Sequence, residues 1–202
     1  MARVLILFAH PAFEKSKVHA RLLKRIRNLS GITFHDLYQL YPDFDIDIKK
    51  EQALLLSHDI IIWQHPFYWY SCPPLLKQWE DLVLEHGWAY GTGGDKLTDK
   101  WIFNAITSGG SKQMYSSMGR NRFAIRTFLA PFDQTAHLCH MKYLPPFVID
   151  GTLKLSNETI EQSALQYERL LVALQNDKIS IEEWNAVEYL NDLNIVSQLI
   201  QS

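Results

Sequence analysis

The chain has few of the features that mark secreted, membrane-spanning or nucleic-acid-binding proteins. Its 202 residues include two cysteines, Cys72 and Cys139, which are too few and too far apart for a disulfide framework or a cysteine-rich zinc site. Lys and Arg number 20 against 22 Asp and Glu, with no long run of either sign, so binding of nucleic acid is not predicted. No stretch approaches the roughly 18 apolar residues of a membrane span. We therefore expect a cytoplasmic protein that reaches the inner face of a membrane only through a partner.

Several motifs of known chemistry are missing as well. The chain has no G-x-G-x-x-G, Walker A or G-x-S-x-G pattern, which argues against the usual dinucleotide fold, nucleotide hydrolases and serine hydrolases. The segment His137-Leu138-Cys139-His140 has metal-ligand residue types, but in an extended segment His137 and Cys139 would face opposite to His140. We predict no metal site.

What the sequence does contain is an alternation of buried β-prone runs with segments of helical spacing. Strands are predicted over 4–8, 32–37, 59–63, 101–107 and 141–149, the last interrupted by Pro145-Pro146. Helices are predicted over 16–29, 48–57, 73–83 and 159–174, whereas the stretch before residue 141 is less regular. This alternation predicts an α/β fold: a doubly wound, five-stranded parallel sheet in the flavodoxin-like order 2-1-3-4-5, with helices on both faces. Residues 1–176 would form this domain and residues 177–202 a helical tail.

In such a sheet, ligands bind outside the carboxyl ends of the strands, so the loops after strands one, three and four are the informative ones. The first of these loops contains His10 and leads to a helix start at Ser16, Lys17, Val18 and His19. Unpaired amides and the Ser16 hydroxyl at that helix start could hold a phosphate. The alternative is that Ser16 is only a helix N-cap.

The second loop brings four aromatic residues in a row after the third strand. Pro66 is followed by Phe67, Tyr68, Trp69 and Tyr70. A core would spread such residues at strand or helix spacing, whereas a planar ring ligand needs flat walls, so we favour a ligand site here. Cys72 is interpreted as an inert small residue rather than a nucleophile.

The third loop is a glycine turn after the fourth strand. Its residues are Thr107, Ser108, Gly109 and Gly110, with Tyr115 following. Glycines there let backbone amides approach the edge of a ligand, although a glycine turn alone is a weak signal.

Taken together, these loops resemble the flavodoxin-like NAD(P)H:quinone oxidoreductases, and among them most closely the ancillary proteins of the glutathione-regulated potassium-efflux (Kef) systems. The likeness runs from about residue 3 to residue 149. It is carried by LYQLYPDFDIDI at 37–48, QHPFYWYSCPPLLK at 64–77, GWAYG at 87–91 and LPP at 144–146.

The resemblance implies a bound flavin, FMN or FAD, that takes hydride from NADH or NADPH and passes it to a quinone. His10 and residues 16–19 would hold the phosphate and ribityl end, and residues 66–69 and 107–110 would contact the isoalloxazine ring. Trp88 and Tyr90 match a segment that walls the substrate site, often across a dimer interface, so a homodimer is implied.

The resemblance also assigns the catalytic residues. Tyr115 matches a tyrosine that hydrogen-bonds the reduced flavin, while Asn121 stands where quinone reductases have the histidine of the tyrosine relay. His19 stands where the family usually has asparagine. Two functions follow: a flavin-dependent quinone reductase, or a flavin-binding regulatory subunit of a potassium-efflux membrane protein with little turnover of its own.

The tail from Ser180 onward has its own apolar pattern. Residues at intervals of mostly three to five are apolar: Ile181, Trp184, Val187, Leu190, Ile195 and Leu199. This spacing predicts one amphipathic helix or two short ones, whose apolar stripe must cover its own domain, a dimer mate or a partner.

Overall fold

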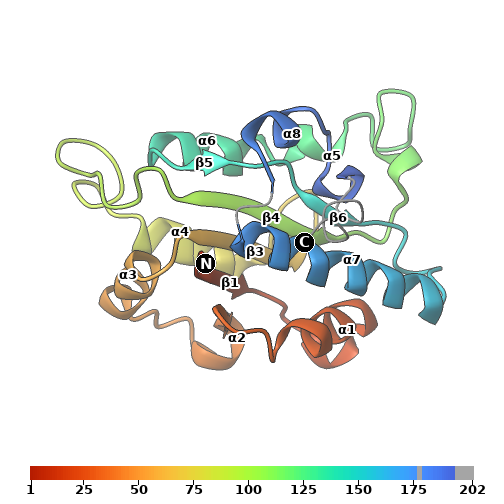
Figure 1. Cartoon of the computed structure of the whole chain (residues 1–202), viewed down its shortest axis with the longest axis horizontal. Coiled ribbons are helices and arrows are strands. Elements are labelled where there is room, and N and C mark those ends of the chain that lie inside the picture. The colour runs from red at the N-terminus through yellow and green to blue at the C-terminus, as the bar shows by residue number, and fades with distance from the viewer. Residues whose placement is uncertain (177–178, 194–202) are drawn as a thin grey trace.

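A single parallel sheet lies at the centre of the molecule in the computed structural model, which describes residues 1–176 and 179–193 (Figure 1). The strand order is β2-β1-β3-β4, and both β5 and β6 pair in parallel with β4. The strands are β1 (Val4–Phe8), β2 (Ile32–Asp36), β3 (Ile60–Pro66), β4 (Trp101–Thr107), β5 (Lys142–Tyr143) and β6 (Phe147–Ile149). The predicted sheet order is confirmed.

The fifth position of the sheet is divided between two short strands, where the sequence predicted one interrupted strand. β5 pairs with Trp101 and Ile102 at the start of β4, and β6 pairs with the last three residues of β4. Pro145 and Pro146 stand between them and have no N–H group to donate to a ladder, so pairing stops there.

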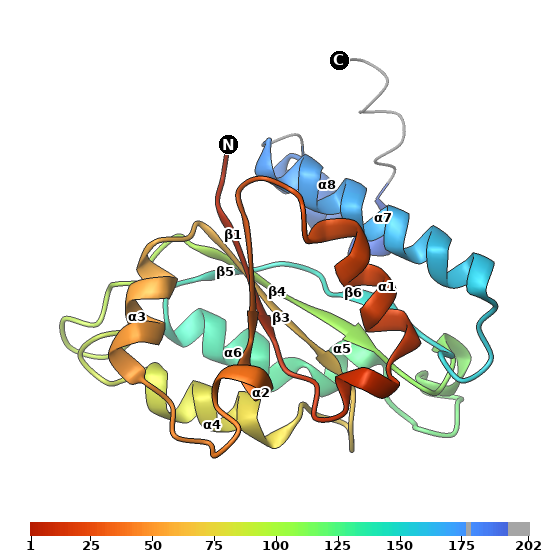
Figure 2. The ribbon, with the colours of Figure 1, turned by 90° about the horizontal axis from the view of Figure 1, so that it is seen from below.

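Helices cover both faces of the sheet (Figure 2). α1 and α7 lie side by side on one face, and α3, α4 and α6 lie on the other. The described helices are α1 (Lys17–Ile26), α2 (Leu37–Leu40), α3 (Ile48–Leu56), α4 (Pro74–Val83), α5 (Ile125–Phe128), α6 (Ala130–Leu138), α7 (Asn157–Gln175) and α8 (Ile181–Asn185). None of the helices in this described part is long and apolar enough to cross a membrane.

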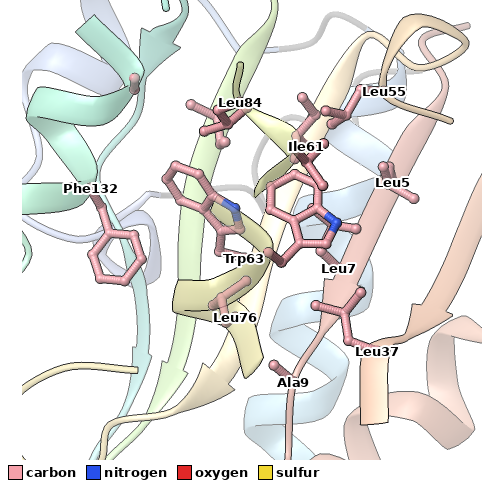
Figure 3. Packing of buried hydrophobic residues seen from close by; sticks show 14 of the residues in the cluster. Leu5, Leu7, Ala9, Leu37, Leu55, Ile61, Trp63, Leu76, Leu84 and Phe132 are labelled. Atoms are coloured by element: carbon pink, nitrogen blue, oxygen red, sulfur yellow. The ribbon is translucent and has the colours of Figure 1, made fainter. Parts of the chain in front are cut away.

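The sheet divides the core into two layers because strand side chains alternate between its faces. In β1, Val4, Ile6 and Phe8 pack in the layer that contains α1 and α7, while Leu5 and Leu7 pack in the layer that contains α2, α3, α4 and α6. Figure 3 shows part of the second layer, with Leu5, Leu7, Trp63, Leu76 and Phe132 labelled. The third strand is buried over its whole length.

Other sequence predictions also differ from the structure. β3 continues through Gln64, His65 and Pro66, because these polar residues have buried hydrogen-bond partners and do not need to leave the sheet. α1 ends at Ile26, earlier than expected. The irregular stretch contains α5 and α6, and His137 lies in α6, so the assumption of an extended segment around His137 was wrong.

The tail turns back onto the domain beyond α7. Ser180 is the N-cap of α8, and its hydroxyl and the Glu183 carboxylate form a capping box. A short 3-10 turn covers Leu190–Asp192. Trp184 and Leu190 are buried in the α1/α7 layer. Ile195 and Leu199 lie outside the described residues.

Candidate functional site

The three predicted loops meet at one edge of the sheet, where β1, β3 and β4 end next to one another. The Ala9 amide donates to the Gln64 carbonyl over 3.0 Å, and the Phe67 amide donates to the Thr107 carbonyl over 2.7 Å. The residues that follow these strands therefore start from neighbouring positions. This is the edge at which a doubly wound sheet binds ligands.

The helix start after β1 offers free backbone donors. Ser16 is the N-cap of α1, and its Oγ accepts from the His19 amide over 3.3 Å. The amides of Lys17 and Val18 have no acceptor among the described residues, as is usual in a first helical turn. Both interpretations of Ser16 are thus compatible: it caps the helix and stands beside two donors suited to a phosphate.

His10 is buried beside this helix start, with its ring centroid 5.2 Å from that of His19. Its Nδ1 accepts from the Ala12 amide over 3.1 Å, so a neutral His10 carries its proton on Nε2. Burial lowers the pKa of His10. Near neutral pH the ring is thus an uncharged donor beside the first turn of α1.

His19 points into the protein. Its ring is fully buried, with Nε2 3.0 Å from Thr107 Oγ1 and Nδ1 3.2 Å from Gln64 Nε2. Burial, and then the neighbouring His10 and His65, lower the pKa of His19 well below its ordinary value. The predicted contact of His19 with a cofactor stays a prediction for its backbone; its side chain joins α1 to the sheet.

The aromatic run after β3 divides into one buried and three exposed rings. Phe67 is in the core, with its ring 5.7 Å from that of Tyr115. Tyr68 and Ser71 exchange backbone hydrogen bonds, which places Trp69 and Tyr70 at φ values of 48° and 65° in a tight turn. Trp69 is 94% exposed as a result. A turn that holds an indole out from the edge of the sheet is suited to contact a planar ligand.

The glycine turn after β4 lies directly against Tyr115. A Cβ atom on Gly110 would be 3.0 Å from Tyr115 Cε2, so the ring packs on the glycine backbone. The amides of Gly109 and Gly110 have no acceptor in the part of the chain that the structure covers. Burial raises the pKa of Tyr115, which keeps its phenol protonated.

Asn121 lies on the same loop, but its side chain bonds a different tyrosine. The Tyr70 hydroxyl donates to Asn121 Oδ1 over 3.4 Å. No hydrogen bond joins Tyr115 to Asn121 among the described residues, so the relay pair stays a prediction.

Trp88 and Tyr90 lie elsewhere in this chain. They belong to the loop between α4 and β4, where the strands begin, and in Figure 1 that loop is at the opposite end of the sheet from the loop after β4. Within one chain they therefore do not join the site formed by the other predicted residues.

Cys72 also gives no sign of reactivity. Burial raises the pKa of its thiol to about 12, so almost no thiolate is present at neutral pH. The interpretation as an inert residue agrees with this environment.

Sequence reasoning missed a set of hydrogen-bonded polar residues that lie inside the protein next to the ends of β3 and β4. Gln64 and His65 leave opposite faces of β3. Gln64 bonds His19 of α1 and Tyr167 of α7, whereas His65 bonds Asn104 of β4, which in turn accepts from Tyr143 of β5. Asn104, Tyr143 and Tyr167 were not predicted. A polar residue inside an apolar strand, as in the WIFNAIT sequence of β4, is a signal that could have found them.

Comparison with known proteins identifies the class of this fold. A sequence model described as the flavodoxin-like fold matches residues 2–171. The chain therefore belongs to the flavodoxin-like fold family.

Curated relatives share more than two fifths of their residues with the chain. It is 47% identical over 162 residues to the uncharacterized NAD(P)H oxidoreductase YrkL of Bacillus subtilis strain 168, covering 80% of this chain and 93% of the relative. It is 43% identical to the glutathione-regulated potassium-efflux system ancillary protein KefF of Citrobacter koseri, covering 85% and 97%.

Solved structures show the same arrangement. General stress protein 14 of Treponema denticola, in complex with FMN, is 40% identical with a TM-score of 0.82 and covers 86% of this chain and 99% of its own. An NADPH-quinone reductase from P. pentosaceus is 30% identical with a TM-score of 0.76, covering 83% and 96%.

Proposed function

We propose that the protein is a flavin-dependent NAD(P)H:quinone oxidoreductase that binds FMN at the carboxyl edge of its sheet. The observation that carries this proposal is the pattern of unpaired donors. Two amides at the start of α1 and two in the glycine turn lack an acceptor among the described residues and lie at the same edge of the sheet: those of Lys17, Val18, Gly109 and Gly110. Such donors suit a phosphate at one end and the acceptor atoms of a flavin ring at the other. The FMN complex of a 40% identical structure supports the choice of FMN.

When bound, the flavin supplies the redox chemistry, taking hydride from the nicotinamide and giving it to the quinone. The chain supplies position and donors. The first turn of α1 and the His10 Nε2–H would hold the phosphate end. Tyr68 and Trp69 would flank the ring, and the glycine-turn amides with the protonated Tyr115 would stabilise negative charge on its edge.

The proposed site is completed by a second copy of the chain. Trp88 and Tyr90 cannot reach the edge at which Tyr115 lies in their own chain. A homodimer that sets the start of one sheet against the loop after β4 of its partner would bring them there. The resemblance of the GWAYG segment to a substrate-site wall supports this arrangement.

A regulatory function is the second candidate. KefF, at 43% identity, is an ancillary protein of a potassium-efflux system, which supports docking on a membrane protein of that class. The two functions are compatible on one protein. Steady-state quinone reduction by purified protein with FMN and NADH or NADPH separates them, because a rate no faster than that of free FMN would leave only the regulatory function.

Flavin titration tests the site itself. We expect Trp69→Ala to weaken FMN binding by about tenfold, because an exposed indole beside the ring loses its stacking. Leu56→Ala is the control, since Leu56 is half-exposed at the end of α3, far from the site. Equal FMN affinity in all three proteins, measured by flavin fluorescence, would contradict the proposed site.

A further inference from the structure

A chain of buried polar side chains runs from α7 to the end of β4. The Tyr167 hydroxyl is 2.9 Å from Gln64 Oε1, Gln64 Nε2 is 3.2 Å from His19 Nδ1, and His19 Nε2 is 3.0 Å from Thr107 Oγ1. Tyr167, Gln64 and His19 have no exposed surface, and Thr107 is 8% exposed. This series of hydrogen bonds therefore begins in the core and ends at the edge of the sheet where the candidate site lies.

These hydrogen bonds can point in either of two directions. In the outward direction, Tyr167 donates to Gln64, the Gln64 amide donates to His19 Nδ1, and a proton on His19 Nε2 donates to Thr107. In the inward direction, Thr107 donates to His19 Nε2, and a proton on His19 Nδ1 donates to Gln64. The oxygen and nitrogen of the Gln64 amide are exchanged, and its NH2 group donates to Tyr167. Each direction requires a neutral His19, and the directions differ in which ring nitrogen carries the proton.

The end groups decide between the two directions. In the inward direction the Tyr167 hydroxyl accepts, and its own proton has no acceptor, because its single hydrogen bond within the described residues is to Gln64. A buried donor without an acceptor disfavours that state by roughly a factor of ten or more. In the outward direction the proton left over is that of the Thr107 hydroxyl, which stands at the site. A ligand can satisfy that proton.

The surroundings of His19 keep it neutral. Burial, and then the nearby His10 and His65, lower its pKa well below the ordinary value. The hydrogen-bond partners of its ring are an amide nitrogen and a hydroxyl oxygen, and neither is a carboxylate that would stabilise a charged ring. A neutral ring whose Nδ1 accepts must carry its proton on Nε2.

We propose that Tyr167, Gln64 and His19 act as positioning residues that fix the Thr107 hydroxyl as a hydrogen-bond donor toward an acceptor atom of the bound flavin. This inference rests on the proposed function for the identity of the ligand. It gives a specific role to His19, because its ring contacts both Gln64 and Thr107 and, in the neutral form, a nitrogen that accepts on one side requires a nitrogen that donates on the other.

A second chain on the other face of the sheet provides the comparison. Tyr143 donates to Asn104, Asn104 Nδ2 is 3.1 Å from His65 Nε2, and His65 Nδ1 is 3.0 Å from the Pro66 carbonyl oxygen. It also begins at a tyrosine, here a partly buried one, and passes through a buried histidine. Because it ends on a carbonyl, it leaves no spare donor at the edge.

Nitrogen NMR of the histidine rings in the flavin-free protein tests the direction of the first chain. We expect His19 at neutral pH to be uncharged with its proton on Nε2. Tyr167→Phe should populate the Nδ1-protonated form, whereas the matched variant Tyr143→Phe should leave His19 unchanged. A proton on Nδ1, or a charged ring, in the parent protein would overturn the proposal, and so would a Tyr167→Phe variant with an unaltered His19.

FMN titration tests the consequence. Thr107→Val should weaken FMN binding by about tenfold and Thr107→Ser should restore it, with thermal unfolding recorded alongside. If Thr107→Val and Thr107→Ser bind FMN with equal affinity, the inference is overturned even if the parent protein binds FMN. If the parent protein binds no FMN while His19 has the expected tautomer, the proposed function fails, but the inferred direction of the hydrogen bonds from Tyr167 to Thr107 is retained.

Discussion

Two buried carboxyl groups show how local partners set the charge of a residue. Glu51 has no exposed surface; burial raises its pKa, but hydrogen bonds from His35, Tyr41 and Trp79 outweigh burial and leave the pKa lowered. Glu80 on α4 is almost as buried, and its Oε1 has no hydrogen-bond partner among the residues that the structure describes. Burial therefore raises the pKa of Glu80 to about 8. Glu51 is therefore charged and joins three elements through its hydrogen bonds, whereas Glu80 is protonated at neutral pH.

The raised pKa of Glu80 predicts that stability falls as pH rises. The unfolded chain releases this proton near its ordinary pKa of 4.5 and the folded protein near 8, so the folded state loses stability between those values. The full loss is on the order of 3–5 kcal/mol. We expect Glu80→Gln to remove most of this dependence in urea unfolding at pH 5, 6.5 and 8.

Glu158→Gln is the control, because Glu158 is an exposed carboxyl group in the first turn of α7, on the other face of the sheet from Glu80. A slope of stability against pH that is equal in the parent and in Glu80→Gln would show that Glu80 is charged in the folded protein.

At the scale of elements, helix starts serve two purposes that can be separated experimentally. Ser16 caps α1 and Ser156 caps α7 in the same way, each hydroxyl accepting from the amide three residues later. The proposed phosphate site includes the first turn of α1 but no residue of α7. The two serines are therefore a pair in which capping is shared and ligand binding is not.

Replacing each serine by alanine should cost about 1 kcal/mol of stability through the lost cap. We expect Ser16→Ala also to weaken FMN binding severalfold, whereas Ser156→Ala should leave it unchanged. Chemical unfolding and flavin titration of the two variants give both quantities. Weaker binding in both, or in neither, would mean that the Ser16 hydroxyl makes no contact with the phosphate.

Element order was predictable from the sequence, because continuous apolar runs and helical spacing carry it. β1 and β4 begin and end where the pattern predicts. α6 was not predicted: its buried residues are Phe132 and Ala136, too few to form a readable stripe. The polar end of β3 was also missed, because Gln64 and His65 are stabilised there by residues distant in the sequence, and no local pattern indicates such partners.

The candidate site, like the fold, could be predicted only in part from the sequence. The loops could be predicted because topology brings the ends of β1, β3 and β4 together whatever their side chains are. That His19 turns inward and that Asn121 bonds Tyr70 follow from three-dimensional packing, which residue types alone do not specify.

For the whole molecule, the described part of the tail after α7, residues 179–193, packs on the domain. The matched relatives are covered almost completely while about a fifth to a seventh of this chain lies outside the match, and the family match ends at residue 171. Ile179, Trp184 and Leu190 are buried all the same, and the Trp184 ring packs edge-on at 4.0 Å from that of Trp101. The added segment thus covers the start of β4 and the α1/α7 layer.

Truncation after Asp177 should therefore lower the melting temperature by more than about 10 °C, because several large buried side chains are lost. We expect FMN affinity measured well below that temperature to change little. Truncation after Leu193 keeps every one of these contacts and is the control. Equal melting curves for the two truncated proteins would show that the tail contributes nothing to the domain.

The side chain of Asn191 behaves like one residue of a further strand. It accepts from the Val148 amide over 2.8 Å and donates to the Val148 carbonyl over 3.0 Å, while the Leu190 amide donates to the Pro146 carbonyl. The outer edge of β6 is thereby closed to other chains. Exposed strand edges invite edge-to-edge aggregation. Loss of this segment would consequently free a template for strand addition, and shortened forms of the protein would be prone to form insoluble oligomers even at temperatures at which they remain folded.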